Sequence, residues 1–185
     1  ADVLVVGGGG GGGGGYRSST PKSYYGNSGS GGEVDEQMGI EIGAESAETS
    51  FAIKVGAGGD KGKGGRSSTS DQGYDGKKGE PSLFSGNGLN IESEGGAGGK
   101  SRKYSSESGG CDDTEKEMSE SGSGTNYVSK ITGATYSKPG ATATGKGLGD
   151  GSDASPNTGN GGNAASDPST QNVNSYGGAG GSGIV

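Results

Sequence analysis

The stretch ADVLVVGGGGGGGGGYRSST (residues 1–20) places an apolar run directly before nine consecutive glycines. The apolar run at 2–6 predicts a buried strand. A strand followed by glycines also begins a dinucleotide-binding site, but that site needs a helix after a G-x-G-x-x-G turn. Here the glycines lead into a polar stretch without an amphipathic run of helical length, and Pro21 interrupts it. We therefore expect a structural role for the glycine run and no nucleotide site.

The composition excludes an ordinary apolar core. Leu, Ile, Val and Phe make up roughly 11 % of the chain, well below the ~20 % under which a packed interior seldom forms. Glycine supplies 48 of the 185 residues. The length fits a single domain over 1–185, and the apolar runs at both ends indicate a fragment of a longer chain.

Charge and residue usage exclude several function classes. The 15 basic and 22 acidic side chains give a net charge of -7, which offers no electrostatic basis for binding nucleic acid. No apolar stretch approaches the ~20 residues of a membrane span, so we expect no membrane insertion. Histidine is absent, which removes the usual partner of a Ser or Cys nucleophile. The lone Cys111 is a free thiol or half of an intermolecular disulfide. We expect no enzyme activity and no cofactor.

Four other segments resemble ligand-binding motifs only in part. EGGAGGKS (94–101) has a glutamate where a phosphate-binding P-loop begins with glycine, and GATATGKG (140–147) lacks the final Ser or Thr that holds magnesium. DKGKG (60–64) and GDGSD (149–153) carry possible calcium ligands without a full binding-loop spacing. Such matches are expected by chance in a glycine-rich chain, so we expect no metal site.

Glycine recurs at every third position in four further segments, namely at 26, 29 and 32, at 56, 59, 62 and 65, at 73, 76 and 79, and at 177, 180 and 183. Three residues per turn is the period of the polyproline-II helix, which glycine adopts as polyglycine II and which makes no internal hydrogen bonds. Because glycine has no Cβ, neighbouring backbones can approach and satisfy one another. The spacing predicts a fold that is mainly β and irregular: a bundle of polyglycine-II helices anchored by short β-strands, with long polar loops.

Short apolar alternations predict the anchoring strands. They are the run at 2–6, Ile40 with Ile42, Phe51 with Ile53 and Val55 as one buried face, Leu89 with Ile91, and the closing GIV at 183–185. The polar stretches at 16–27, 66–75, 100–121 and about 125–176 are expected to be loops. DDTEKEMSE (112–120) could form a short helix capped by Asp112 or Asp113.

Tyrosine is concentrated in the polar stretches. Rigid amphipathic rings among Ser, Gly and Asn are typical of recognition surfaces, although the same rings could instead shield glycine backbones. The candidate receptor-binding residues are Arg17, Lys22, Tyr24, Tyr25, Arg102, Tyr104, Tyr127 and Tyr136. The tyrosines would stack on a sugar or protein surface, and the cations would pair with anionic groups. The tetrapeptide RSST at 17–20 returns at 66–69, which indicates repeated turn chemistry.

Several segments together resemble the glycine-rich domain of bacteriophage tail-fibre and related surface proteins. They are DVLVVGGGGGGG (2–13), FAIKVGAGGDKGKGG (51–65), DGKKGEPSLF (75–84), GLNIESEGGAGG (88–99) and GGAGGSGIV (177–185). The resemblance implies a polyglycine-II bundle in a virion tail fibre, with loops at its far end that contact a host cell-surface protein or polysaccharide. Other tail-fibre chains would be further partners. The alternatives are an extracellular bacterial structural or matrix fibre without a specific receptor and, more remotely, a nucleotide-binding enzyme.

Overall fold

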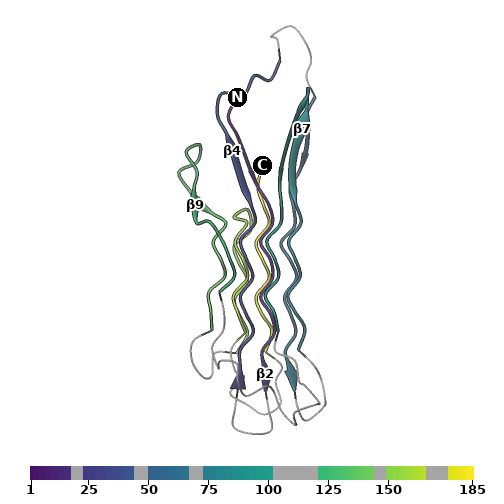
Figure 1. Ribbon diagram of the computed structural model, residues 1–185, viewed down its shortest axis with the longest axis vertical. Coiled ribbons are helices and arrows are strands. Elements are labelled where there is room, and N and C mark those ends of the chain that lie inside the picture. Colours follow the sequence, from purple (N-terminus) through teal and green to yellow (C-terminus); the bar gives the residue numbers. More distant parts are fainter. Residues whose placement is uncertain (18–22, 44–49, 67–72, 102–120, 144–148, 166–174) are drawn as a thin grey trace.

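The computed structural model describes residues 1–17, 23–43, 50–66, 73–101, 121–143, 149–165 and 175–185. These residues form no α-helix, a few short strands and mostly irregular, extended backbone that runs along the long axis of the molecule (Figure 1). The strands are β1 (Val3–Val6), β2 (Tyr16–Arg17), β3 (Ser23–Tyr24), β4 (Val34–Gln37), β5 (Ala52–Lys54), β6 (Gly65–Arg66), β7 (Ser82–Gly86), β8 (Leu89–Ser93), β9 (Tyr127–Val128) and β10 (Thr135–Tyr136).

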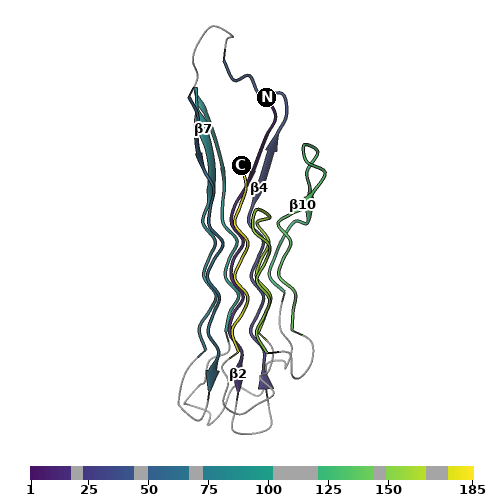
Figure 2. The ribbon, with the colours of Figure 1, turned by 180° about the vertical axis from the view of Figure 1, so that it is seen from behind.

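The strands form small sheets toward the two ends of the molecule. β1 pairs with β4, β5-β7-β8 form an antiparallel sheet, and β9 pairs with β10. The sheet β3-β2-β6 lies at the opposite end from β4 and β7, as Figures 1 and 2 show. We call the end with β3-β2-β6 the β2 end and the end with β4 and β7 the β4 end.

A central segment, residues 7–14, connects the two ends and bonds to its neighbours through its backbone. Its amides donate in turn to three segments, so that every third amide donates to the same neighbouring segment. Gly7, Gly10 and Gly13 donate to Glu33, Ser30 and Asn27; Gly8, Gly11 and Gly14 donate to Glu80, Lys77 and Tyr74; Gly9 and Gly12 donate to Gly181 and Gly178. All three acceptor segments run antiparallel to the central one.

The carbonyls of the central segment accept bonds from three more segments that run parallel to it. Gly59 and Gly62 donate to Gly9 and Gly12, Gly96 and Gly99 donate to Gly8 and Gly11, and Gly162 and Ala165 donate to Gly10 and Gly13. Among the described residues, the central segment therefore has six neighbours, which we call the ring segments: 26–33, 56–65, 73–80, 94–100, 159–165 and 177–183. Around the central segment their order is 26–33, 94–100, 73–80, 56–65, 177–183 and 159–165. Each of these segments is bonded to the next and the last is bonded to the first, so the ring is closed.

The glycine pattern follows from this packing. A Cβ placed on Gly12 would overlap the carbonyl oxygen of Asn163, and one on Gly11 would overlap that of Asp60. The central segment is surrounded on every side, so each of its residues must be glycine. A ring segment such as 56–65 needs glycine only where it faces a neighbour, which leaves outward positions such as Lys63 free to carry a side chain.

Two small apolar clusters anchor the β4 end. Val3 and Val5 pack with Ile91, and Leu4 and Val6 pack with Tyr136. The predicted strands at 2–6 and around Leu89 and Ile91 are confirmed as β1 and β8. The predicted closing strand is reduced to an isolated antiparallel bridge between Ile184 and Val6.

Two predictions about the strands are wrong. Ile40 and Ile42 lie outside any strand, because β4 ends at Gln37 and the φ of 67° at Gly39 is incompatible with a continuing strand. Phe51, Ile53 and Val55 do not form a buried face. β5 is an edge strand in its sheet, and Ile53 and Val55 are 60 % and 47 % exposed.

The sequence reasoning also missed two features. Asn87 and Gly88, both with positive φ, form the turn of a β7–β8 hairpin, and an Asn-Gly pair is a strong hairpin signal. The tract at about 125–176 was expected to be a loop, yet 159–165 is a ring segment and 137–141 bonds to it from outside. The predicted helix at 112–120 and Cys111 lie outside the described residues.

Candidate functional site

The β2 end is built from three two-residue strands in a defined register. Arg17 pairs with Ser23 on one side and, in parallel, with Arg66 on the other. Tyr16 pairs likewise with Tyr24 and with Gly65. Because successive residues of a strand face opposite sides of the sheet, one row of the sheet is Ser-Arg-Arg and the next is Tyr-Tyr-Gly.

The bundle sets this register. The amide of Gly65 donates to the carbonyl of Gly15 at 3.0 Å, so the central segment and segment 56–65 leave the bundle in parallel and side by side. The two RSST tetrapeptides therefore begin at one register position, with Arg17 beside Arg66. Sequence reasoning proposed Arg17 but missed Arg66, although the repeated tetrapeptide was a signal that could have found it.

The bundle next to this end carries carboxylates that already have donors. Asp75 accepts the Ser101 amide at 2.8 Å and pairs with the Lys100 Nζ at 3.0 Å. Partial burial acts to raise the pKa of Asp75, but the bonds from Ser101 and Lys100 together hold that pKa below its usual value of 3.8. Asp150 accepts the amide of Tyr176 at 2.7 Å. These two carboxylates therefore serve the bundle itself.

The eight candidate residues fall into separate groups. The backbone positions of Arg17 and Tyr24 lie in the sheet of the β2 end, and Tyr25 follows directly and is half-buried. Tyr127 and Tyr136 lie in the β9–β10 hairpin, away from that sheet (Figures 1 and 2). The structure does not bring the two groups together. The remaining candidates, Lys22, Arg102 and Tyr104, lie outside the described residues.

Of the two roles that the sequence left open for the tyrosines, recognition and packing, Tyr136 has the packing role. Its side chain is only 5 % exposed and packs with Leu4 and Val6. Its hydroxyl lies 3.1 Å from the hydroxyl of Thr132. The ring therefore shields the anchor of the bundle and offers little surface to a ligand.

Tyr127 lies in an acidic setting that Glu36 of β4 creates. The Lys130 amide donates to both Glu36 carboxylate oxygens, at 3.0 and 3.1 Å. A bond from Ser129 is the main cause that lowers the pKa of Glu36 below its usual 4.5, helped by the Lys130 and Ile131 amides and Tyr127. Desolvation and the Glu36 charge raise the pKa of Tyr127. Glu36 thus tethers the hairpin to β4.

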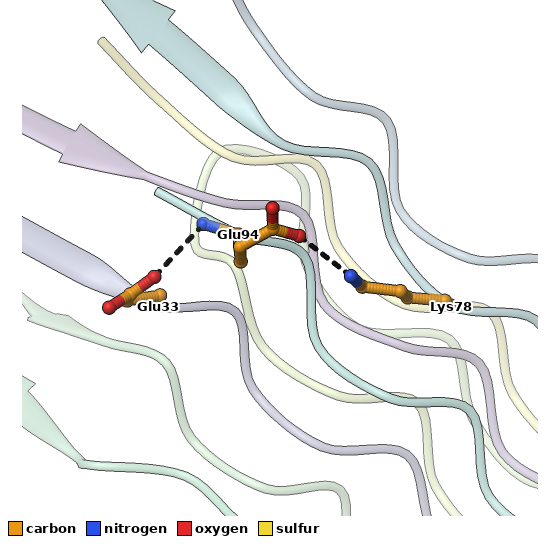
Figure 3. A network of polar contacts seen from close by, with 3 residues as sticks. All are labelled: Glu33, Lys78 and Glu94. Atoms are coloured by element: carbon orange, nitrogen blue, oxygen red, sulfur yellow. Dashed lines mark hydrogen bonds and ion pairs between the residues drawn. The ribbon is translucent and has the colours of Figure 1, made fainter. Parts of the chain in front are cut away.

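The P-loop-like segment at 94–101 is part of the bundle. Glu94 donates its amide to Glu33 Oε2 at 3.2 Å and accepts Lys78 Nζ on its own Oε2 at 2.6 Å (Figure 3). The amides of Gly96 and Gly99, which would face a phosphate in a P-loop, donate to the central segment. These contacts join three ring segments, and they occupy the Gly96 and Gly99 amides within the bundle.

The other motifs examined in the sequence also hold the bundle together. Asp153 accepts the amide of Ala179 at 2.8 Å, and Asp60 pairs with Lys77 at 2.9 Å. Within the described ranges no group of three or more acidic or thiol side chains could hold a metal ion. The same ranges contain no helix that could cross a membrane.

Comparison with known proteins agrees with the glycine pattern. No curated protein and no solved structure matches the chain. The family model of the glycine-rich domain matches residues 1–185. The chain therefore belongs to the glycine-rich domain family.

Proposed function

We propose that the central and ring segments are polyglycine-II helices, and that the chain is a non-enzymatic receptor-binding or distal structural domain of a bacteriophage tail fibre. The observation that carries the first part is the three-residue repeat of lateral hydrogen bonds along residues 7–14. Three residues per turn without internal bonds is the signature of this helix type. The order of the glycine segments, which resembles that of tail-fibre domains, supports the second part.

The bundle would act as a stiff stem. Fixing one backbone residue costs about 1–2 kcal/mol, and one hydrogen bond returns about 0.5–1.5 kcal/mol net. A single pair of such helices would therefore be unstable. In the closed ring, by contrast, every N–H and every C=O group of residues 8–13 of the central segment is hydrogen-bonded to a ring segment. Stability is therefore collective, and the stem would display whatever is attached at its end in a fixed orientation.

The β2 end is the recognition surface in this proposal. The described segments that flank residues 18–22, 67–72, 102–120, 144–148 and 166–174 end toward it (Figure 1). Connections on a rigid scaffold commonly carry binding functions. The partner would be a protein or polysaccharide on the host cell surface, and the location would be the virion.

A cell-binding experiment tests the proposal. The purified chain, labelled with a fluorophore, is incubated with a panel of bacterial strains, and bound fluorescence is measured. A variant with Tyr24→Ala and Tyr25→Ala should lose binding to the susceptible strain, while the control Tyr127→Ala at the hairpin should retain it. Binding to no strain would favour an extracellular matrix fibre. A rise in melting temperature with ATP, NAD or FAD would favour the nucleotide-binding alternative.

A further inference from the structure

We propose that a row of ion pairs along one face of the bundle prevents a second copy of the chain from adding its own extended segments to that face. The row crosses ring segments 56–65, 73–80 and 94–100. We call it the charged face, and it consists of Asp60, Asp75, Lys77, Lys78, Glu94 and Lys100. This inference concerns association between bundles and goes beyond the proposed recognition role.

Another part of the ring shows how this bundle takes up a further extended segment. Segment 137–141 lies where two ring segments meet and bonds to both through its backbone. The Gly140 amide donates to the Gly29 carbonyl at 3.0 Å, and the Lys138 carbonyl accepts the Gly161 amide at 2.8 Å. The junction between two ring segments is therefore a place where one more backbone can bind.

The ring residues that contact outer segments have short, uncharged side chains. Asn160 and Asn163 accept amides of segment 137–141 on their side-chain oxygens. Ser30 Oγ likewise accepts the amide of Ser123 at 3.1 Å. Such side chains let an outer segment approach and satisfy some of its amides.

The charged face has the same kind of backbone under different side chains. Among the described residues, the backbone hydrogen bonds of residues 57–64 and 74–79 run to the central segment and to flanking ring segments, and none runs outward. Outward-facing N–H and C=O groups of an extended chain are a template for pairing with another chain. A second copy of this chain has glycine segments of the same kind to offer.

On this face, side chains cross the junctions in place of an outer segment. Lys77 Nζ lies 2.9 Å from Asp60 Oδ2, across the junction between their two ring segments. These side chains are 74 % and 72 % exposed, so the pair lies open to solvent. The next junction is crossed by two more pairs, Lys78 with Glu94 at 2.6 Å (Figure 3) and Lys100 with Asp75 at 3.0 Å.

These pairs act mainly on an approaching chain. Exposed ion pairs add little to the stability of the fold that carries them. A backbone segment seated over the pairs would take their charges out of water, and the desolvation of an ion pair is costly. Charged side chains protect exposed strand edges in the same way. The pairs therefore keep the outward backbone groups open to water and closed to another bundle.

Self-association of the full chain tests the charged face. The fourfold variant carries Asp60→Asn, Lys77→Asn, Lys78→Asn and Glu94→Asn, which places at both junctions a residue type that contacts an outer segment elsewhere. Two acidic and two basic side chains are lost, so the net charge stays at -7. Sedimentation velocity at increasing concentration should show a dimer dissociation constant at least about 10-fold lower than that of the wild type. A melting curve checks that each variant is folded.

An exchanged variant is the matched control. Asp60→Lys with Lys77→Asp, and Lys78→Glu with Glu94→Lys, reverse each pair and keep opposite charges across both junctions. This variant should associate no more than the wild type. A double variant, Asp60→Asn with Lys77→Asn, opens one junction only and should give an intermediate dissociation constant. It also serves as the test if the fourfold variant does not fold.

Hydrogen exchange locates the contact between copies. In the fourfold variant, the backbone amide of the exposed Lys61 should exchange more slowly at high protein concentration than at low concentration, because another backbone then covers it. Three results would overturn the inference. They are asparagine variants that associate no more than the wild type, an exchanged variant that associates as strongly as the fourfold variant, and association that leaves exchange at Lys61 unchanged.

Discussion

The amide of Gly12 donates to the carbonyl of Gly178 at 2.8 Å, between segments that lie far apart in the sequence. The carbonyl of the same glycine accepts a bond from Gly62. A residue without a side chain thereby connects two ring segments. Backbone groups perform here the cohesive role that apolar side chains perform in most domains.

Gly12→Ala should strongly destabilise the protein. The new Cβ would overlap the carbonyl oxygen of Asn163, and the surrounding ring cannot give way without breaking lateral hydrogen bonds. Overpacking and one unsatisfied buried bond together predict a loss of about 2–5 kcal/mol in the free energy of unfolding. Thermal or denaturant melts measure it. The control Ala97→Ser, at an exposed position of a ring segment, should change that energy by less than about 0.5 kcal/mol. Equal effects would argue against close backbone packing.

Asn163→Ala should weaken the attachment of the outer segment 137–141. Asn163 Oδ1 accepts the Ala141 amide at 2.8 Å, and Asn160 Oδ1 accepts the Lys138 amide at 2.9 Å three residues away. Loss of one such bond should reduce stability by about 0.5–1.5 kcal/mol and speed hydrogen exchange at Ala141. Asn163→Asp keeps an acceptor oxygen and should preserve slow exchange. An unchanged rate of hydrogen exchange at Ala141 in the alanine variant would show that the Asn163 side chain does not hold the outer segment in place.

The tether between Glu36 and the β9–β10 hairpin should respond to acid. The pKa of Glu36 is lower in the folded protein than its usual 4.5, so its stabilising effect is complete above that pH. The effect disappears as the pH falls through the lowered folded value. The Lys130 amide resonance, followed by NMR, should therefore titrate with a midpoint below 4.5.

Glu36→Gln is the control for this titration, because it retains an acceptor oxygen without an ionisable group. The Lys130 amide should then show no transition of its own in the acid range. A midpoint at or above 4.5 in the wild type, or the same transition in the variant, would contradict the role of Glu36.

Apolar residues of the β5-β7-β8 sheet should contribute unequally to the free energy of unfolding. Ile91→Ala removes a buried side chain that packs with Val3 and Val5, and should cost about 2–4 kcal/mol. Ile53→Thr, on the exposed edge strand, should cost less than about 1 kcal/mol. Chemical denaturation of both variants measures the difference. Similar losses would mean that β5 is covered in solution.

The period of the glycines predicted lateral bonding between extended segments, because in a backbone with three residues per turn every third residue faces the same neighbour. The bonds of residues 7–14 follow that repeat. The runs at 2–6 and around Ile91 were predictable strands because their apolar residues had no other place to be buried. Alternation could not show that Ile53 is exposed, since the pattern does not say whether another element covers the face.

The arrangement of the 125–176 tract was not predictable, because the outer segment 137–141 is attached partly through side chains that accept hydrogen bonds in place of backbone carbonyls. Asn160 and Asn163 look like loop residues in the sequence, yet their side-chain oxygens accept hydrogen bonds from backbone amides of the outer segment. The pairing of Arg17 with Arg66 was likewise hidden. It depends on two segments leaving the bundle in parallel, which no local pattern records.

Scalar couplings across hydrogen bonds test the central claim most directly. In a uniformly labelled sample, the ¹⁵N of Gly12 should couple to the carbonyl ¹³C of Gly178, and the ¹⁵N of Gly11 to that of Lys77. Both amides should also exchange slowly with solvent. Absence of these couplings, together with rapid exchange along residues 7–14, would contradict a bundle held by its backbone.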